Sequence, residues 1–151
     1  MPESHELGYS VCEALLRAGV VGRVGFTSPA GPEVAPVNYS VVDTTVVLRT
    51  SADSALATYG VDAVVAFETD HVDFTSHRGW SVVARGRAAL VHDPKELDRI
   101  RHEWEPRPWA SGPRETTLRI RWDELTGRKL GEGWDPLLDL PQRRVVQARG
   151  R

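Results

Sequence analysis

The sequence predicts a mainly β domain, a small barrel of about six antiparallel strands with peripheral helices. Residues 20–51 contain successive segments rich in Val, Tyr and Thr that are joined by short turns, and this continuity favours antiparallel pairing. A long alternating segment, 79–91, carries a glycine in its middle, as strands do where a barrel bends. The strands are too numerous for a βαβ sheet and too scattered among helices for an immunoglobulin sandwich.

Length and composition bound the class of protein. The chain has 151 residues and a formal charge of −2, which does not suggest a nucleic-acid binder. No run of about 18 apolar residues could cross a membrane, and the first residues lack the pattern of a signal peptide. We therefore expect a cytoplasmic domain over residues 1–131, followed by a tail over 132–151 that is extended or contacts a partner. Cys12 is alone and cannot form an internal disulfide.

The first elements are predicted to be a helix and a strand. Ser10 and Glu13 have the spacing of a capping box, which predicts a helix over residues 11–18. Gly19 would end that helix in a left-handed conformation. Residues 20–27 form the first predicted strand.

The segment 33–51 predicts a β-hairpin with a two-residue turn. In this register Val42 pairs with Thr45, and Asn38 pairs with Arg49. One face then holds Asn38, Ser40, Val42, Thr45, Val47 and Arg49, and the other holds Val37, Tyr39, Val41, Val46, Leu48 and Thr50. An amide and a guanidinium thus meet at the open end of the hairpin, where we expect a polar ligand.

A short helix is predicted directly after the hairpin, over residues 52–60. Ser51 or Asp53 can cap its start and Gly60 can end it. A strand that runs into a helix start lined with hydroxyl groups is a typical anion-binding arrangement.

The next segments predict two strands. Residues 63–69 are nearly all apolar and predict a central strand, and residues 70–78 predict a polar loop. Residues 79–91 predict the longest strand, with a bend or bulge at Gly86.

The last elements are a helix and the closing strands. Asp93 is the predicted helix cap, with Pro94 in the first turn and Glu96 closing a capping box. The predicted inward-facing side chains are Leu97, Ile100 and Trp104 on the helix and Leu118, Ile120 and Trp122 on the strand 115–122. Residues 106–109 predict a loop, residues 123–126 a turn, and residues 127–130 a last short strand.

The order of several short motifs resembles a known family. The motifs are Val21-Gly22-Arg23-Val24, Pro36-Val37-Asn38-Tyr39, Leu48-Arg49-Thr50-Ser51, Gly79-Trp80-Ser81-Val82, Arg85-Gly86-Arg87, Pro108-Trp109 and Leu125-Thr126-Gly127-Arg128-Lys129-Leu130. Together, over about residues 15–130, they resemble the pyridoxamine 5′-phosphate oxidase-like family of FMN-binding split barrels. The branch that they resemble most includes nitroimidazole-reductase-like proteins.

The resemblance implies a split barrel that forms a homodimer, with FMN bound at the subunit interface. Arg49, Thr50 and Ser51 would hold the phosphate. Val37 and Asn38 would meet the polar edge of the ring system, and Trp80 and Ser81 would contact the isoalloxazine. The full set of implied cofactor-binding residues is Val37, Asn38, Arg49, Thr50, Ser51, Ser54, Trp80, Ser81, Trp109 and Arg128, with Trp109 and Arg128 contributed by the partner chain or the rim.

One position departs from the family pattern. Ala55 stands where members of the family often have a lysine, and Asp53 lies just before it. Fewer positive charges would weaken a phosphate site. The deazaflavin F420, whose longer tail could find other contacts, is therefore an alternative cofactor.

Several of these residues could instead have a purely structural role. Arg49 could be an ion-pair partner at the barrel end, Asn38 could be satisfied by water, and Trp80 could fill the barrel. Arg85 and Arg87 share a strand face that could be solvated.

Three functions remain open, and no residue is assigned as catalytic. The first is an FMN-dependent oxidoreductase acting on a nitroaromatic, a quinone, a vitamin B6 phosphate or another small acceptor. The second is an F420-dependent reductase of the same fold. The third is a non-catalytic flavin- or haem-binding protein, for which His71, His77 and His92 are the candidate axial ligands. No metal site is expected, because the cluster of Asp70, His71, Asp73 and His77 lacks ligand spacing.

Overall fold

The computed structural model describes residues 4–104 and 115–140. The strands are β1 (Ser4–Glu6), β2 (Val21–Ser28), β3 (Gly31–Val42), β4 (Thr45–Thr50), β5 (Val64–Asp73), β6 (Arg78–Val91) and β7 (Thr116–Leu130). The helical elements are α1 (Tyr9–Ala18), α2 (Pro94–Trp104), the one-turn π-helix η1 (Leu56–Gly60) and the 3₁₀ turn η2 (Pro136–Asp139).

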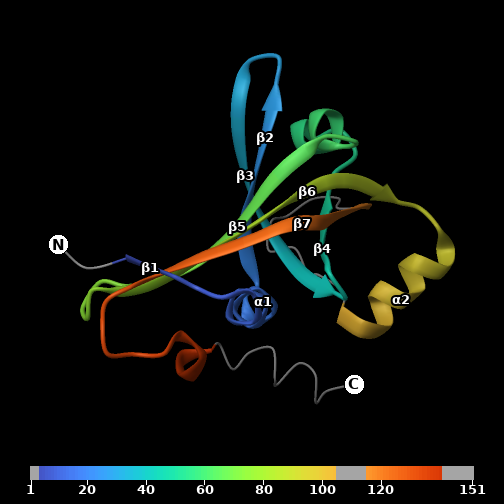
Figure 1. Cartoon of the computed structure of the whole chain (residues 1–151). Helices are drawn as coiled ribbons and strands as arrows, with labels where there is room; N and C mark the ends of the chain where they lie inside the picture. The colour runs from blue at the N-terminus through green and yellow to red at the C-terminus, as the bar shows by residue number, and fades with distance from the viewer. Residues whose placement is uncertain (1–3, 105–114, 141–151) are drawn as a thin grey trace.

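Six strands form a closed antiparallel ring in the order β7-β4-β3-β2-β5-β6, and a second pairing of β6 with β7 closes it. The strand β1 pairs with the other end of β7, outside the ring. Figure 1 shows α1 at one end of the barrel and α2 beside β4. The predicted mainly β barrel of about six antiparallel strands is therefore confirmed.

The β3–β4 hairpin has the predicted register from Val42 opposite Thr45 to Tyr39 opposite Leu48, but the predicted pair of Asn38 and Arg49 is not formed, because the strands separate there. The two faces of the hairpin pack in two separate hydrophobic clusters. Tyr39, Val41, Val46 and Leu48 pack in the barrel core, which also includes Cys12, Leu15 and Leu16 of α1. Val42 and Val47 pack on the other side against Val91 and Ile100. The hairpin is therefore a wall between the core and α2.

The first helix ends at Ala18, before Gly19, as predicted, but its predicted start and the predicted conformation of Gly19 are wrong. Gly8 is the N-cap residue and no side chain caps the helix, so Ser10 and Glu13 lie inside α1. At the other end Gly19 is extended, with φ −75° and ψ 166°. Position 19 requires glycine for a steric reason and not a conformational one. A Cβ there would lie 2.1 Å from the hydroxyl oxygen of Tyr39.

The β5–β6 hairpin is longer than predicted. Residues 70–73, expected in a loop, continue β5 and pair with β6 as far as Asp73 opposite Arg78. Asp73 organises the turn, since its Oδ1 accepts hydrogen bonds from the N–H groups of Thr75 (2.9 Å) and Ser76 (3.3 Å). The hydrogen bonds from Ser76 lower the pKa of the Asp73 carboxyl group.

The predicted irregularity at Gly86 is confirmed, and its partner strand explains it. Arg85 lies opposite Glu124 and Gly86 opposite Trp122, so Asp123 is an extra residue that forms a bulge in β7. A Cβ on Gly86 would lie 1.8 Å from the carbonyl oxygen of Arg121. The predicted turn over 123–126 and separate strand over 127–130 are wrong, because β7 runs through both segments.

The helix α2 begins as predicted, because Asp93 Oδ1 accepts a hydrogen bond from the Lys95 N–H group (3.1 Å). Glu96 does not close a capping box, and its carboxylate pairs with Arg119 of β7 instead. Ile100 is buried against the hairpin as expected. The predicted loop over 106–109 lies outside the described residues.

Of the predicted tail, residues 132–140 are described. Trp134, Leu137 and Leu140 pack against the barrel core, and the indole N–H of Trp134 donates to the carbonyl oxygens of Leu130 (2.9 Å) and Gly131 (3.0 Å). Within the described part of the chain, neither α-helix has the length and apolar character needed to cross a bilayer.

Candidate functional site

A cavity of about 250 Å³ lies where β3 and β4 separate. Five of the predicted cofactor-binding residues line it: Val37, Asn38, Arg49, Thr50 and Ser54. The rest of its lining consists of Phe26, Glu33, Val34, Ala35, Pro36, Ala55 and Leu56. We call it the split cavity. The side chains that the sequence analysis placed at the open end of the hairpin are therefore brought together.

The split arises because the β3–β4 pairing stops at Tyr39 opposite Leu48. Before that point, residues 31–38 of β3 pair with β2 only, while β4 continues along β7 with Arg49 opposite Thr117. Asn38 and Arg49 are therefore the first residues on either side of the opening. The separation leaves one edge of β3 facing the cavity.

The strand alternation fixes which backbone groups face this edge. The Tyr39 N–H donates to the Val20 carbonyl oxygen (3.0 Å), toward β2. Because both backbone groups of a strand residue point to the same side and alternate along the strand, those of Val34 and Pro36 point away from β2. Pro36 has no N–H group to leave unbonded there, as is typical of proline in an edge segment.

Two hydroxyl groups, one from the end of β4 and one from the following turn, converge on the cavity. The Thr50 hydroxyl donates to Ser54 Oγ (2.9 Å), which also accepts the Ala57 N–H (3.1 Å). Ser54 therefore caps this turn, and the expectation that Ser51 or Asp53 does so is wrong. With two hydrogen bonds accepted, the hydroxyl hydrogen of Ser54 is the group that it can donate to a ligand.

The short helix contributes less to anion binding than expected. It is one turn of π-helix, over residues 56–60, rather than a regular helix from residue 52. Such a turn aligns few peptide dipoles. The side-chain donors that an anion would meet are therefore mainly those of Arg49 and Ser54.

Arg49 lies between two cavities. It lines the split cavity and also a cavity of about 100 Å³ under α2, whose lining includes Ile100, Arg101 and Glu115. Its guanidinium supplies several N–H donors in a planar fork, which suits phosphate or carboxylate oxygens.

Glu33 is a residue of the split cavity that the sequence analysis missed. Its Oε2 atom is buried and accepts no hydrogen bond from any described residue. A glutamate just after the Gly31-Pro32 turn gives no sequence signal beyond an exposed strand start. Only the separation of β3 from β4 reveals its position.

The other predicted site residues lie elsewhere in the protomer. Trp80 is 4% exposed and packs in the barrel core, so the structure supports its interpretation as a barrel-filling residue. Ser81 and Arg128 line a separate cavity of about 410 Å³, together with Arg85 and other residues of β6 and β7. Within the described residues, the two cavities share no lining residue.

Two more predicted residues complete the set. Ser51 does not line the split cavity, and its carbonyl oxygen accepts the Ser54 N–H (3.1 Å). Trp109 lies outside the described residues.

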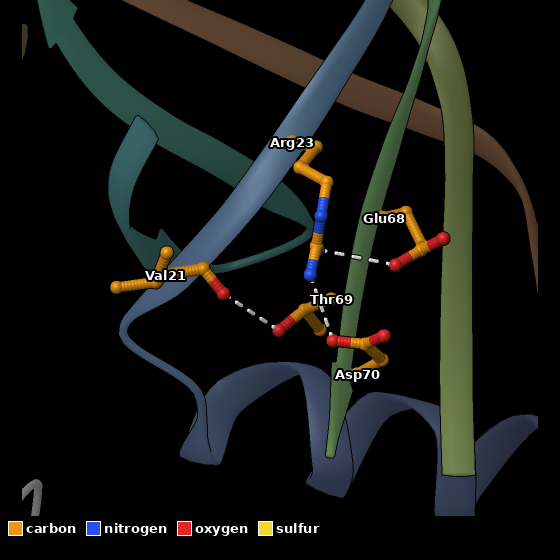
Figure 2. Close-up of polar contacts among 5 residues, drawn as sticks. All are labelled: Val21, Arg23, Glu68, Thr69 and Asp70. Carbon is orange, nitrogen blue, oxygen red and sulfur yellow. Dashed lines mark hydrogen bonds and ion pairs between the residues drawn. The ribbon is translucent and has the colours of Figure 1, made fainter. Parts of the chain in front are cut away.

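Another arginine on the barrel, Arg23, is already engaged by carboxylates. Its guanidinium pairs with Glu68 Oε1 (3.2 Å) and Asp70 Oδ1 (2.9 Å) across the β2–β5 pairing, as Figure 2 shows. Next to this pair, the Thr69 hydroxyl donates to the Val21 carbonyl oxygen (2.9 Å). Arg23 therefore ties two strands together and is not a candidate for the anion site.

The histidine candidates for haem ligation are all exposed. His71 lies on β5, His77 lies in the β5–β6 turn and His92 follows β6. None of the three lines the split cavity or the cavity that contains Arg128. Among the described residues, no group of three or more His, Cys, Asp or Glu side chains is arranged to hold a metal ion.

Comparison with protein families identifies one match across most of the chain. The family model described as pyridoxamine 5′-phosphate oxidase matches residues 10–129. The uncharacterized protein Rv0080 of Mycobacterium tuberculosis is 36% identical over 114 residues, which cover 72% of this chain and 74% of that protein.

Solved structures share the fold. The FAD binding protein from Mycobacterium smegmatis is 27% identical, with a TM-score of 0.70 over 83% of this chain and 97% of that one. A candidate pyridoxamine 5′-phosphate oxidase from Corynebacterium glutamicum is also 27% identical, with a TM-score of 0.73 over 89% and 98%. A candidate 5-nitroimidazole antibiotic resistance protein from Bacteroides thetaiotaomicron, 18% identical with a TM-score of 0.69 over 86% and 89%, shows the fold alone.

Proposed function

Because the chain belongs to the pyridoxamine 5′-phosphate oxidase family, we propose that it binds a flavin nucleotide and acts as a flavin-dependent oxidoreductase on a small electron acceptor. The observation that carries the proposal is the convergence of Arg49, Thr50, Ser54 and Asn38 on one cavity. Arg49, Ser54 and Asn38 supply the donors that a ligand with a phosphate and a polar ring requires, and the hydroxyl of Thr50 holds Ser54 in place.

The residues present fit a flavin phosphate and one edge of its ring. Arg49 would hold the phosphate with its planar fork, and Ser54 would donate its hydroxyl hydrogen to a phosphate oxygen. Val37 and Asn38 would face the polar edge of the ring. A bound flavin would supply the hydride or electron transfer, and the protein would hold it and shield one face from water.

A homodimer would complete the site. The split cavity measures about 250 Å³, which is smaller than the roughly 300–1,000 Å³ of typical cofactor and ligand sites. A flavin anchored at Arg49 would therefore extend beyond it. We propose that the cavity lined by Ser81 and Arg128 in one protomer faces the split cavity of its partner, so that the ring lies between the subunits.

FMN is the cofactor that we propose first, since a single phosphate matches a single arginine-hydroxyl cradle. FAD is the second candidate, because the similar protein from Mycobacterium smegmatis is an FAD binding protein. The cavity under α2 that Arg49 also lines could take the second phosphate of FAD. F420 stays an alternative, because Ala55 lines the cavity in place of a family lysine.

The chemistry proposed for this chain uses no catalytic side chain. The ionisable residues that line the split cavity are Glu33 and Arg49, and an arginine stays protonated at working pH. The substrate would be a small acceptor such as a nitroaromatic or a quinone.

The test uses the purified 151-residue chain. Its visible spectrum and its titration with FMN, FAD, riboflavin and F420 identify the cofactor, and light scattering gives the oligomeric state with and without it. We expect flavin absorbance, a dimer, and reduction by a nicotinamide donor followed by reoxidation with an acceptor. A protein that binds none of these cofactors would refute the proposal.

A further inference from the structure

Glu33 places a carboxylate in the split cavity that no described residue neutralises. Its Oε2 atom is buried and accepts no hydrogen bond, and it forms no ion pair within 4.0 Å with any described arginine, lysine or histidine. Arg49 lines the same cavity, so two opposite charges face one space without contacting each other.

The position of Glu33 along β3 separates it from the arginine. Asn38 and Arg49 flank the opening, and Glu33 lies five residues before Asn38 on the strand. At about 3.3 Å per residue, the two ends of this stretch are about 16 Å apart. Because a carboxylate repels a phosphate, the anionic end of a ligand would lie near Arg49 and away from Glu33.

A buried carboxylate oxygen without a donor destabilises the protein that contains it. Replacement by an apolar residue of similar size would remove that penalty. The neighbouring side chains supply no donor, because Glu33 is flanked on its own face of β3 by Ala35 and lies opposite Phe26 of β2. A group that enters the cavity can supply the missing donor.

We propose that Glu33 is a specificity-determining residue of the split cavity, whose carboxylate accepts a hydrogen bond from an N–H or O–H group of the bound flavin. This inference rests on the proposed function and adds a requirement to it. The ligand must carry an anion at one end and a hydrogen-bond donor further along. In a flavin, the imide N–H of the ring and the hydroxyls of the ribityl chain are such donors.

The test measures stability and affinity in the same variants. In Glu33→Leu, the apoprotein should gain thermal stability, by roughly 2–4 °C, because an undonated carboxylate has been removed. The same variant should bind riboflavin roughly tenfold more weakly, because the acceptor is lost. Glu33→Gln keeps an acceptor oxygen and should stay within a few-fold of wild type. Glu132→Leu, at an exposed glutamate outside the cavity, is the matched control and should change neither quantity.

Modified flavins identify the donor. The ratio of Kd in Glu33→Leu to Kd in wild type is measured for riboflavin, N3-methylriboflavin, which lacks the imide N–H, and lumiflavin, which lacks the ribityl hydroxyls. The ratio should be about ten for riboflavin and approach one for the ligand that lacks the relevant donor.

The outcomes separate this inference from the proposed function. A wild-type protein that binds no flavin overturns both. Flavin binding with an unchanged Kd in Glu33→Leu overturns the role of Glu33 alone, and so does a ratio that persists for both modified ligands. A change of oligomeric state in Glu33→Leu with unchanged affinity per dimer would assign Glu33 to a subunit contact and would also overturn it. If Glu33→Leu does not fold, Glu33→Asp, which withdraws the carboxylate by one methylene group, takes its place with the same expected loss of affinity.

Discussion

The hydroxyl of Thr50 donates a hydrogen bond of 2.9 Å to Ser54 Oγ, which links the last residue of β4 to the turn that follows it. Ser54 Oγ also accepts the Ala57 N–H, so both of its acceptor positions are occupied. The hydroxyl hydrogen of Ser54 is thereby directed away from the protein's own backbone. One hydroxyl thus shapes the turn and keeps a donor for a ligand.

Ser54→Ala should weaken FMN binding by roughly tenfold, because a donor to a charged oxygen is lost. Riboflavin has no phosphate, and its affinity should not change. Ser54→Thr retains the hydroxyl and serves as the control. Fluorescence titration of both ligands measures the effect, and an equal loss for riboflavin would show that Ser54 does not contact the phosphate.

Arg49→Ala should weaken FMN binding by about 1.5–3 kcal/mol, the scale of a charge-assisted hydrogen bond. Arg49→Lys should recover part of this, since it restores the charge without the planar fork. The control is Arg17→Ala, because Arg17 donates to the Asp43 carbonyl oxygen (2.5 Å) at the closed end of the same hairpin. An unchanged Kd in folded Arg49→Ala would contradict the phosphate role.

Ala55→Lys should tighten FMN binding by about 1 kcal/mol, because it adds a cation to the lining of the split cavity. The gain should shrink as salt is added. Ala52→Lys adds the same charge at an exposed position outside the cavity lining and is the matched control. Equal gains in FMN affinity in the two variants would indicate a general electrostatic effect and would contradict a phosphate site beside residue 55.

Gly86→Ala should lower the free energy of unfolding by about 3 kcal/mol or more, because a Cβ would collide with the β7 backbone at Arg121. Thermal unfolding followed by circular dichroism measures the loss. Gly25→Ala is the control, since its Cβ would meet only the Ala66 carbonyl oxygen at an ordinary 3.8 Å. A small effect at Gly86 would mean that β6 and β7 can move apart at the bulge.

Tyr39→Phe should cost about 1–2 kcal/mol of stability, because the buried Tyr39 hydroxyl donates to the Leu16 carbonyl oxygen (2.5 Å) at the end of α1. Gly19→Ala should be severely destabilising, since its Cβ would meet the same hydroxyl at 2.1 Å. The double variant should be less destabilised than the sum of the two, because the colliding oxygen is gone. Additive losses in a thermal unfolding cycle would contradict this account.

Residue patterns within one hairpin were sufficient to predict its register. The alternation from Tyr39 to Val42 and from Thr45 to Leu48 matches the structure pair by pair, because a two-residue turn leaves one register that buries both apolar sets. The bend at Gly86 was also predictable, since an isolated glycine in a strand is typical of a close backbone approach.

Features that depend on two distant segments were not predictable in the same way. The extra residue Asp123 looked like part of a turn, because only the pairing of Arg85 with Glu124 and of Gly86 with Trp122 reveals a bulge. The polar end of β5 looked like a loop, although its side chains are exposed on a paired strand. Near the N-terminus, Ser10 and Glu13 have the spacing of a capping box, but the N-cap residue of α1 is Gly8, two residues before Ser10.

The residues of the candidate site also differ in whether a single segment of sequence was enough to predict them. Asn38, Arg49 and Thr50 were predictable because they follow the last pair of the hairpin register at its open end. Glu33 was not, because its place in the cavity depends on where β4 leaves β3. Trp80 has the hydrophobic character of either a ligand contact or a core residue, and only its burial distinguishes the two.

The unpaired edge of β3 bears on how the protein avoids edge-to-edge aggregation. An open strand edge can template pairing with the edge of another molecule. Pro32 and Pro36 lie on either side of Val34 among the residues whose backbone groups point away from β2, and neither proline has an N–H group to donate to an incoming strand. Two missing donors interrupt any intermolecular ladder that would otherwise run along the segment, which leaves the opening accessible to a small ligand while protecting the chain from aggregation.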